Sequence, residues 1–279
     1  MNYLHTLLFI LILTVFNLSR VYATCGLEYC PLASHIYMQN DEEPPEWYIS
    51  ENLVYSDFPS GNTDRKFGVA QTRVEYAGIE QMSVGFMVPL IVLETVSGNE
   101  FDMGNPIAFA EYRFIQKTNM IISFGTQLLL PVGSTDSGLA SHHSEVMPFL
   151  SFLYSGEQWY GFSNVGFLAP LGHAHDHSVT TSVNSITLTP NAHSSGEIVF
   201  RAGGGYLLSQ NFRFEIFTLG QIVTAHDHST NNETWFQTAG LGLRWLVNPS
   251  LEIHPTFLLP VTIAKRINYQ AAISTMIRI

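Results

Sequence analysis

Residues 235–245 read WFQTAGLGLRW, and residues 251–259 read LEIHPTFLL. In the first stretch, large apolar side chains recur at 235, 241, 243 and 245, with glycines and Arg244 between them. In the second, positions 251, 253, 257 and 259 are apolar, whereas Glu252, His254 and Thr256 are polar. Since successive side chains of a strand point to opposite faces, this two-residue period predicts strands with one apolar and one polar face.

The same period recurs along the chain and predicts about twelve strands. We place them near residues 46–57, 67–78, 82–93, 106–115, 120–131, 146–153, 159–169, 196–208, 212–223, 234–246, 251–262 and 271–279. The short connections fall at 79–81, 116–119, 154–158, 209–211 and 247–250. They alternate with longer polar ones around 58–66, 94–105, 132–145, 170–195, 224–233 and 263–270. This arrangement is typical of outer-membrane barrels, whose long loops face outside the cell. The sequence therefore predicts an all-β fold, a transmembrane up-and-down antiparallel β-barrel over residues 46–279.

The composition supports a membrane barrel rather than a soluble sandwich. Charged residues make up only 13% of the chain, and the outer face of a sandwich would carry far more Lys and Glu. Past the first residues, the chain has no uncharged apolar run long enough for a transmembrane helix. The net charge of -11 argues against binding to nucleic acid or anionic lipid. We expect outer-membrane lipid as a partner and no nucleic acid.

The N-terminal residues have the features of an export signal. An apolar run from Leu7 to Leu18 precedes the small-residue pattern ending at Ala23, which predicts a cleaved signal peptide over residues 1–23. The alternative, a membrane anchor, is disfavoured because the run is short for a bilayer. Residues 24–45 are then a periplasmic segment in which Cys25 and Cys30 form a disulfide clip, with metal binding by the two cysteines as the alternative.

Four prolines follow a hairpin repeat. Pro89, Pro131, Pro170 and Pro260 are expected near the outer ends of upward strands, because proline cannot donate a hydrogen bond to the ladder. Aromatic residues at expected strand ends fit the girdles of a membrane barrel, namely Trp47, Trp159, Tyr160, Trp235, Trp245 and Tyr269. Both features place the strand ends at a membrane boundary.

Several of these segments together resemble one protein family. They are LLPVG at 129–133, LAPLG at 168–172, FDMGNPIAFAEYRF at 101–114 and AISTMIRI at 272–279. Over residues 65–279 the chain resembles the outer-membrane family called transporters, also labelled the MetA-pathway of phenol degradation family. The resemblance implies a barrel of the bacterial outer membrane, assumed to pass small molecules and to need no cofactor. We expect the barrel to be a monomer. Such barrels commonly end in an aromatic residue that the barrel-assembly machinery recognises, whereas this chain ends in Ile279.

If the apolar face of each strand points outward to lipid, a set of charged side chains points into the lumen. Three Arg-x-Glu or Glu-x-Arg pairs at strand spacing place opposite charges on one face, within reach of neighbouring strands. The expected pore-lining residues are Arg73, Glu75, Glu111, Arg113, Arg213, Glu215, Arg244, Glu252 and His254, joined by Glu197, Arg201 and Arg278. Most lie near a short turn, hence in the periplasmic half. They form either a structural ion network that fills the barrel or a charged constriction that selects solutes.

Eight of the eleven histidines fall in three polar stretches that a barrel would bring to one mouth. The candidate metal ligands are His142, His143, His173, His175, Asp176, His177, His226, Asp227 and His228, with His193 nearby. An H-x-H pair on an extended segment points both rings the same way, and nitrogen and oxygen ligands suit Zn(II), Cu(II) or Ni(II). The alternatives are ordinary loop residues that bind metal adventitiously, or a pH sensor.

These features favour an outer-membrane channel for small solutes, with metal ions captured at the outer mouth. A surface barrel acting as adhesin or scaffold is the alternative. An outer-membrane lipid hydrolase is a weaker one, since His142-His143-Ser144 echoes the His and Ser spacing of barrel phospholipases, yet the glycine- and asparagine-containing surroundings that would supply the other catalytic groups are missing. We expect no enzymatic activity.

Overall fold

The computed structural model describes residues 47–58, 65–95, 98–117, 119–132, 144–171, 196–223, 235–262 and 267–279. Within these ranges the chain forms thirteen strands and no helix, and none of the described residues forms a helix that could cross a membrane. The strands are β1 (Trp47–Phe58), β2 (Arg65–Ile79), β3 (Met82–Thr95), β4 (Gly98–Met103), β5 (Ile107–Lys117), β6 (Met120–Leu129), β7 (Ser144–Ser155), β8 (Trp159–Leu171), β9 (Glu197–Ser209), β10 (Phe212–Val223), β11 (Trp235–Asn248), β12 (Leu251–Pro260) and β13 (Tyr269–Arg278).

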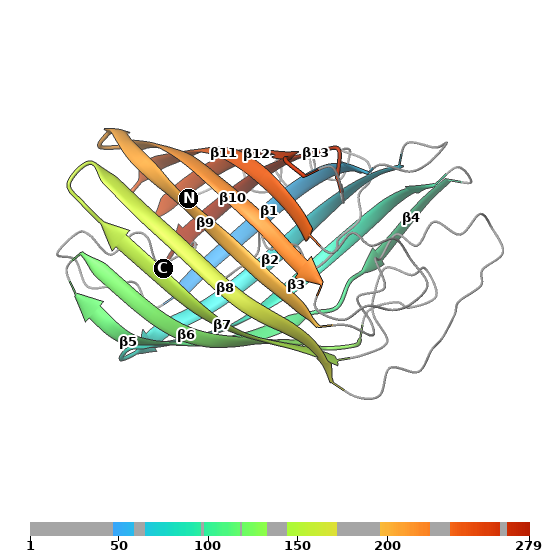
Figure 1. Ribbon diagram of the computed structural model, residues 1–279, viewed down its shortest axis with the longest axis horizontal. Coiled ribbons are helices and arrows are strands. Elements are labelled where there is room, and N and C mark those ends of the chain that lie inside the picture. The colour runs from blue at the N-terminus through green and yellow to red at the C-terminus, as the bar shows by residue number, and fades with distance from the viewer. Residues whose placement is uncertain are drawn as a thin grey trace, which may run out of the picture.

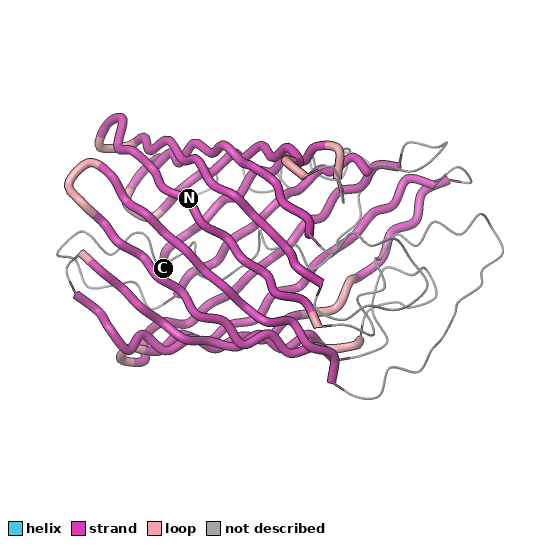
Figure 2. The backbone as a smooth tube through the Cα atoms, in the orientation of Figure 1, coloured by secondary structure: helices cyan, strands magenta, loops and turns pink. Residues whose placement is uncertain are grey.

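Twelve of the strands close into an antiparallel barrel. Each pairs with its neighbour in sequence, and β1 pairs with both β2 and β13, so that no edge is left in the ring. Figure 2 shows the strands inclined to the long axis, with front and rear walls crossing. The short turns gather at one end of the barrel, at the left of Figure 1. The prediction of a closed up-and-down β-barrel is confirmed.

The strand β4 lies outside the ring and was not predicted. The first half of β3 pairs with β5 as far as Met87, and from Leu90 onward β3 pairs with β4 instead. Pro89 lies at this change of partner, where its carbonyl accepts a hydrogen bond from the Gly104 N–H at 3.0 Å. The sequence reads as a polar loop here because four of the six residues of GNEFDM are Gly, Asn, Glu and Asp, although Phe101 and Met103 share a face. β3 is long enough to form a hairpin with this segment beyond the barrel wall.

The outer face of the wall is apolar and exposed. Large side chains such as Phe86, Phe124 and Phe167 are each more than 40% exposed, although buried residues flank them in the strand. Aromatic pairs mark the two rims of this face. Trp47 contacts Tyr76 and Tyr154 contacts Trp159 near the short turns, and Phe257 and Tyr55 contact Tyr269 near the opposite end. An apolar belt between two aromatic girdles is the surface of a barrel that spans a membrane.

Phenylalanines on the inner face pack over glycines of the neighbouring strand. Phe109 lies directly across from Gly85, Phe149 from Gly125, and Phe217 from Gly240. A Cβ added at Gly125 would lie 2.2 Å from Cζ of Phe149, so only glycine leaves room for the ring. These contacts help to fix, from inside the barrel, the register of β3 with β5, of β6 with β7 and of β10 with β11.

The interior has two layers of different chemistry. An apolar cluster comprises Val54, Val69, Ile91, Val199, Phe217, Leu219, Leu258 and Ile267. Most of its members lie farther from the short turns than the charged side chains do. Most of the charged side chains form the second layer, nearer the short turns, which is the periplasmic end of such barrels. Glu145 and Glu197 are buried at the opposite ends of β7 and β9. One girdle assignment was wrong: Tyr160 is buried inside the barrel, with 5% of its surface exposed.

Candidate functional site

Every strand of the closed wall contributes a polar side chain to the inner face at the level nearer the short turns. We call this set the polar belt. Its described members are Asn52 in β1, Arg73 and Glu75 in β2, Ser83 in β3, Glu111 and Arg113 in β5, Ser123 in β6, Ser151 in β7, Tyr160 and Asn164 in β8, Arg201 in β9, Arg213 and Glu215 in β10, Arg244 in β11, Glu252 and His254 in β12, and Ser274 and Arg278 in β13.

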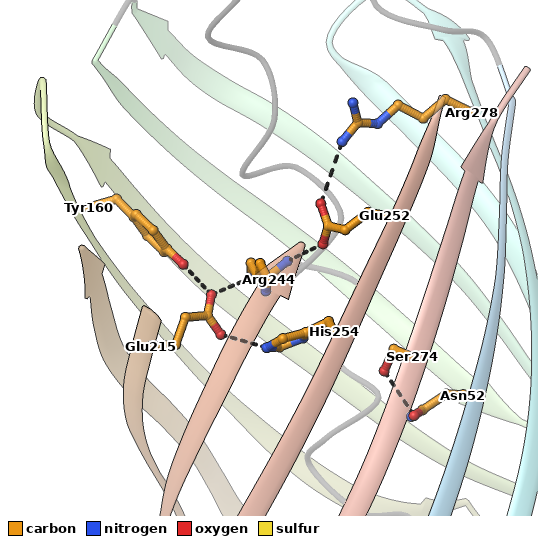
Figure 3. A network of polar contacts seen from close by, with 8 residues as sticks. All are labelled: Asn52, Tyr160, Glu215, Arg244, Glu252, His254, Ser274 and Arg278. Carbon is orange, nitrogen blue, oxygen red and sulfur yellow. Dashed lines mark hydrogen bonds and ion pairs between the residues drawn. The ribbon is translucent and has the colours of Figure 1, made fainter. Parts of the chain in front are cut away.

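Glu215 is the centre of the belt on one side of the barrel (Figure 3). Its side chain is fully buried and accepts hydrogen bonds from the Tyr160 hydroxyl and from Nε of Arg244. The second carboxylate oxygen of Glu215 lies 3.0 Å from Nε2 of His254. Three groups from β8, β11 and β12 therefore converge on one carboxylate of β10. This satisfies a charge whose burial alone would be costly.

Arg244 extends the network toward β13. Its Nη1 donates to Oε1 of Glu252 at 3.1 Å, and Oε2 of Glu252 lies 3.8 Å from Nη2 of Arg278. Gly242 makes this packing feasible, because a Cβ there would lie 2.6 Å from Nε2 of His254. The charges alternate in strand order from β10 to β13, so Arg244 and Glu252 each lie between two opposite charges.

The other side of the belt is built from shorter links. Arg73 is paired with Glu75 of its own strand, and its guanidinium carbon lies 4.5 Å from the centroid of the Phe109 ring. Ser123 Oγ donates to Glu111 and lies within hydrogen-bond distance of Ser151 Oγ. The belt therefore continues through hydroxyl groups across β5, β6 and β7, where the wall carries fewer charges.

Besides Arg73, two further arginines of the belt lie over aromatic rings. The guanidinium carbon of Arg201 lies 4.9 Å from the Phe162 ring centroid and 4.8 Å from that of Phe217. That of Arg213 lies 5.9 Å from the Tyr160 ring. Such contacts hold a cation in place without cancelling its charge.

All nine residues expected to line a pore lie on the inner face. Eight of them are buried or nearly so, and Arg213 is half-buried. The structure brings Glu215, Arg244, Glu252 and His254 into one network, while Arg73 and Glu75 form a separate pair. Sequence reasoning missed the hydroxyl members Tyr160, Ser123 and Ser151. Each of these three residues lies two positions from another inward-facing residue of its own strand, and this spacing was the signal that could have identified them.

A cavity of about 100 Å³ lies in the lumen beside the belt. Its wall includes Arg73 of β2 and Arg201 of β9, two strands that stand six places apart in the ring of twelve and so face each other across the bore. Arg244, Glu252 and His254 also line it. The apolar residues of the wall are Met87, Phe217, Leu219, Ala272 and Met276. Its neutral polar residues are Ser50, Asn52, Gln71, Thr256, Ser274 and Thr275.

The candidate metal ligands of the outer loops, His142, His143, His173, His175, Asp176, His177, His226, Asp227 and His228, lie outside the described residues, as do Cys25 and Cys30. Among the residues that are described, no group of three or more His, Cys, Asp or Glu side chains could hold a metal ion. Ser144 begins β7 and pairs with Leu171 of β8.

No family model and no curated protein sequence matches the chain. Solved structures do match it. The COG4313 outer membrane channel from Pseudomonas putida F1 has a TM-score of 0.67 and 10% identity, with 87% of this chain and 98% of that one covered. The NanC porin has a TM-score of 0.52 and 10% identity, covering 84% and 100%, and the KdgM porin 0.52 and 7%, covering 83% and 99%. The chain has the fold of these barrels, and its apolar belt places it in the bacterial outer membrane.

Proposed function

We propose that this barrel is an outer-membrane channel for small solutes, that it works as a monomer, and that it belongs to the transporter family labelled MetA-pathway of phenol degradation. The observation that supports a channel best is the polar belt, to which all twelve wall strands contribute around a cavity in the bore. A ring of charged side chains in a narrow, low-dielectric bore acts strongly on a passing solute.

The proteins of similar fold support the same role. One is described as an outer membrane channel and two as porins, and in each case the match covers almost the whole of that chain. The charged belt then acts as the constriction that selects solutes. It contains six arginines and four glutamates, so its described charges favour anions over cations.

Conductance in planar bilayers tests the proposal. We expect the purified barrel to give steady ion currents, and we expect Arg213→Gln and Arg244→Gln to change the current and to reduce its preference for anions. Trp235→Phe, on the exposed outer face, serves as the control. Absence of current and of solute flux in proteoliposomes would contradict a channel and favour a surface barrel acting as adhesin or scaffold. Unchanged current with lowered stability would show that the belt is only structural.

The finer part of the proposal is that the outer loops capture divalent transition metals. Residues 172–195 connect β8 to β9, and residues 224–234 connect β10 to β11, so the HAHDH and HDH segments leave the same end of neighbouring hairpins. Two H-x-H pairs at that mouth would supply four imidazole ligands for Zn(II), Cu(II) or Ni(II), and Asp176 and Asp227 would orient or complete them.

Calorimetry on the refolded barrel tests metal capture. We expect Zn(II) or Cu(II) to bind far more tightly than millimolar, and we expect replacement of His173, His175, His226 and His228 by Asn to abolish that binding. Replacement of His35, outside these loops, is the control. Binding that is equally weak in both proteins would sink the metal proposal while leaving the channel proposal intact.

A further inference from the structure

We propose that the lumen cavity is a binding subsite for small amphipathic carboxylates, that is, molecules with one carboxylate on a short apolar body. This inference rests on the proposed channel function and names the class of solute for which the bore is built. Its evidence is the composition of the cavity wall, which divides into a cationic part and an apolar part.

The cationic part of the wall presents three guanidinium groups and a single carboxylate. Arg73, Arg201 and Arg244 line the cavity together with Glu252. Glu75 and Glu215, which hold Arg73 and Arg244, are not among the lining residues, so these carboxylates orient the guanidinium groups from behind. Glu252 is itself bonded to Arg244 at 3.1 Å. The charge that a solute meets in the cavity is therefore positive, and guanidinium is the cation whose planar fork matches a carboxylate.

Arg201 and Arg73 approach the cavity from opposite sides of the bore. Arg201 is placed by the rings of Phe162 and Phe217 and Arg73 by the ring of Phe109, and these contacts fix the side chains while preserving their charge. Two cations that face each other across a small space favour an anion between them. Ser50, Asn52, Gln71 and Ser274 add neutral hydrogen-bonding groups to the same wall.

The apolar part of the wall adjoins the cationic part at Phe217. This residue lines the cavity, carries Arg201 on its ring, and belongs to the apolar cluster of the interior. Leu219 also belongs to both the cavity wall and the cluster, and Met87 and Met276 line the cavity as well. A fully hydrated anion such as phosphate gains nothing from these side chains, whereas an alkyl chain is removed from water by them.

The size of the cavity limits the solute. A volume of about 100 Å³ accommodates a carboxylate with a short chain. Members of the apolar cluster that do not line the cavity, such as Val54, Val69 and Leu258, lie farther along their strands from the short turns than the lining residues of the belt do. A solute that enters from outside would therefore pass the apolar layer before its carboxylate reaches the arginines.

Equilibrium binding to the full-length refolded barrel in detergent micelles tests the inference, with butyrate as the probe and ligand-observed NMR as the readout. Butyramide has the same shape without the charge, and acetate and inorganic phosphate are anions with little or no apolar part. We expect butyrate to bind at least tenfold more tightly than each of the three. Equal binding of butyrate and butyramide, or of butyrate and phosphate, would overturn the inference, and this comparison needs no variant.

Variants locate the binding. We expect Arg201→Gln to weaken butyrate binding at least tenfold, and Arg73→Gln on the opposite wall to do the same if the first variant fails to fold. Lys117→Gln is the control, because Lys117 is an exposed cation at the end of β5 that neither belongs to the belt nor lines the cavity. Unchanged binding in both lining variants would overturn the assignment to this cavity. Butyrate binding without any solute flux would refute the proposed channel function but leave the subsite. Flux of neutral solutes without butyrate binding would refute the subsite but leave the channel function.

Discussion

Glu215 of β10 and Arg244 of β11 are bonded diagonally across their strand pair. By register Glu215 lies opposite Gly242 and Arg244 lies opposite Arg213, so the ion pair links non-opposed residues. Because the residue directly opposite Glu215 is a glycine, there is space beside the carboxylate, and the His254 side chain from the next strand, β12, occupies it. One buried carboxylate thereby joins β8, β10, β11 and β12 through a single set of contacts.

Removal of Arg244 is expected to lower the stability of the barrel strongly. In Arg244→Met the carboxylates of Glu215 and Glu252 stay buried without this cation, which costs about 3–5 kcal/mol for a broken buried pair. Urea titration of the barrel folded in phospholipid vesicles, followed by tryptophan emission, measures the free energy of unfolding. Arg213→Met is the control and should cost far less, because Arg213 is half-buried.

The double variant Arg244→Met with Glu215→Gln separates charge from packing. If the loss in Arg244→Met comes from a buried charge, neutralising Glu215 should recover part of it. If the loss of unfolding free energy in the double variant equals the sum of the losses in the two single variants, the two residues act independently, which would contradict their contact.

Tyr160→Phe tests the hydroxyl link of the belt. The hydroxyl donates to a fully buried carboxylate, and its loss should cost about 1–3 kcal/mol, since hydrogen bonds to charged groups lie at the strong end. Tyr206→Phe is the matched control: Tyr206 is 50% exposed and donates to Gln158 at 3.0 Å, so its loss should be close to neutral. Equal effects in the two variants would argue against a buried role for Tyr160.

Gly125→Ala tests the packing of phenylalanine over glycine on the inner face. The added Cβ would lie 2.2 Å from the Phe149 ring and 2.7 Å from the carbonyl oxygen of Ala110, so we expect a loss of about 1–3 kcal/mol, as for other overpacked sites. Gly161→Ala is the control, because its nearest neighbour would be the Gly203 oxygen at 3.8 Å. The same unfolding titration compares them, and a neutral Gly125→Ala would contradict the close approach.

The strands of the barrel could be predicted because the membrane imposes a two-residue period on them. In β11 and β12 the outward residues are apolar and the inward ones include Arg244, Glu252 and His254, so the sequence alone assigned both faces. The positions of the charged side chains inside the barrel follow from that same assignment. Their individual partners do not, since they depend on the stagger of neighbouring strands.

The predictions were wrong or silent where the period fails. In β3 the stretch FMVPLIVL is apolar on both faces, so the inner apolar cluster and the change of partner at Pro89 left no trace in the pattern. Tyr160 was assigned to a girdle because an aromatic residue at a strand end suits either face, and only the hydrogen bond to Glu215 distinguishes them. The long histidine-containing loops carry no periodic signal, and their metal site stays a prediction.

Glu51 is an acidic residue on the lipid-facing side of β1, and its replacement is expected to stabilise the barrel. It is exposed, it alternates with the inward Ser50 and Asn52, and it lies opposite Thr72 and Thr275. A rise of about 3.3 Å per residue and a strand tilt of about 40° put it about 10 Å along the membrane normal from Trp47 in the girdle. At that depth Glu51→Leu should gain about 1–2 kcal/mol in vesicles, because a carboxylate no longer faces acyl chains. Glu80→Leu, in the exposed turn after β2, is the control and should gain nothing. The Glu51 side chain is also hydrogen-bonded to that of Thr72. A destabilised Glu51→Leu barrel in vesicles would mean that this hydrogen bond outweighs the cost of placing the carboxylate against lipid.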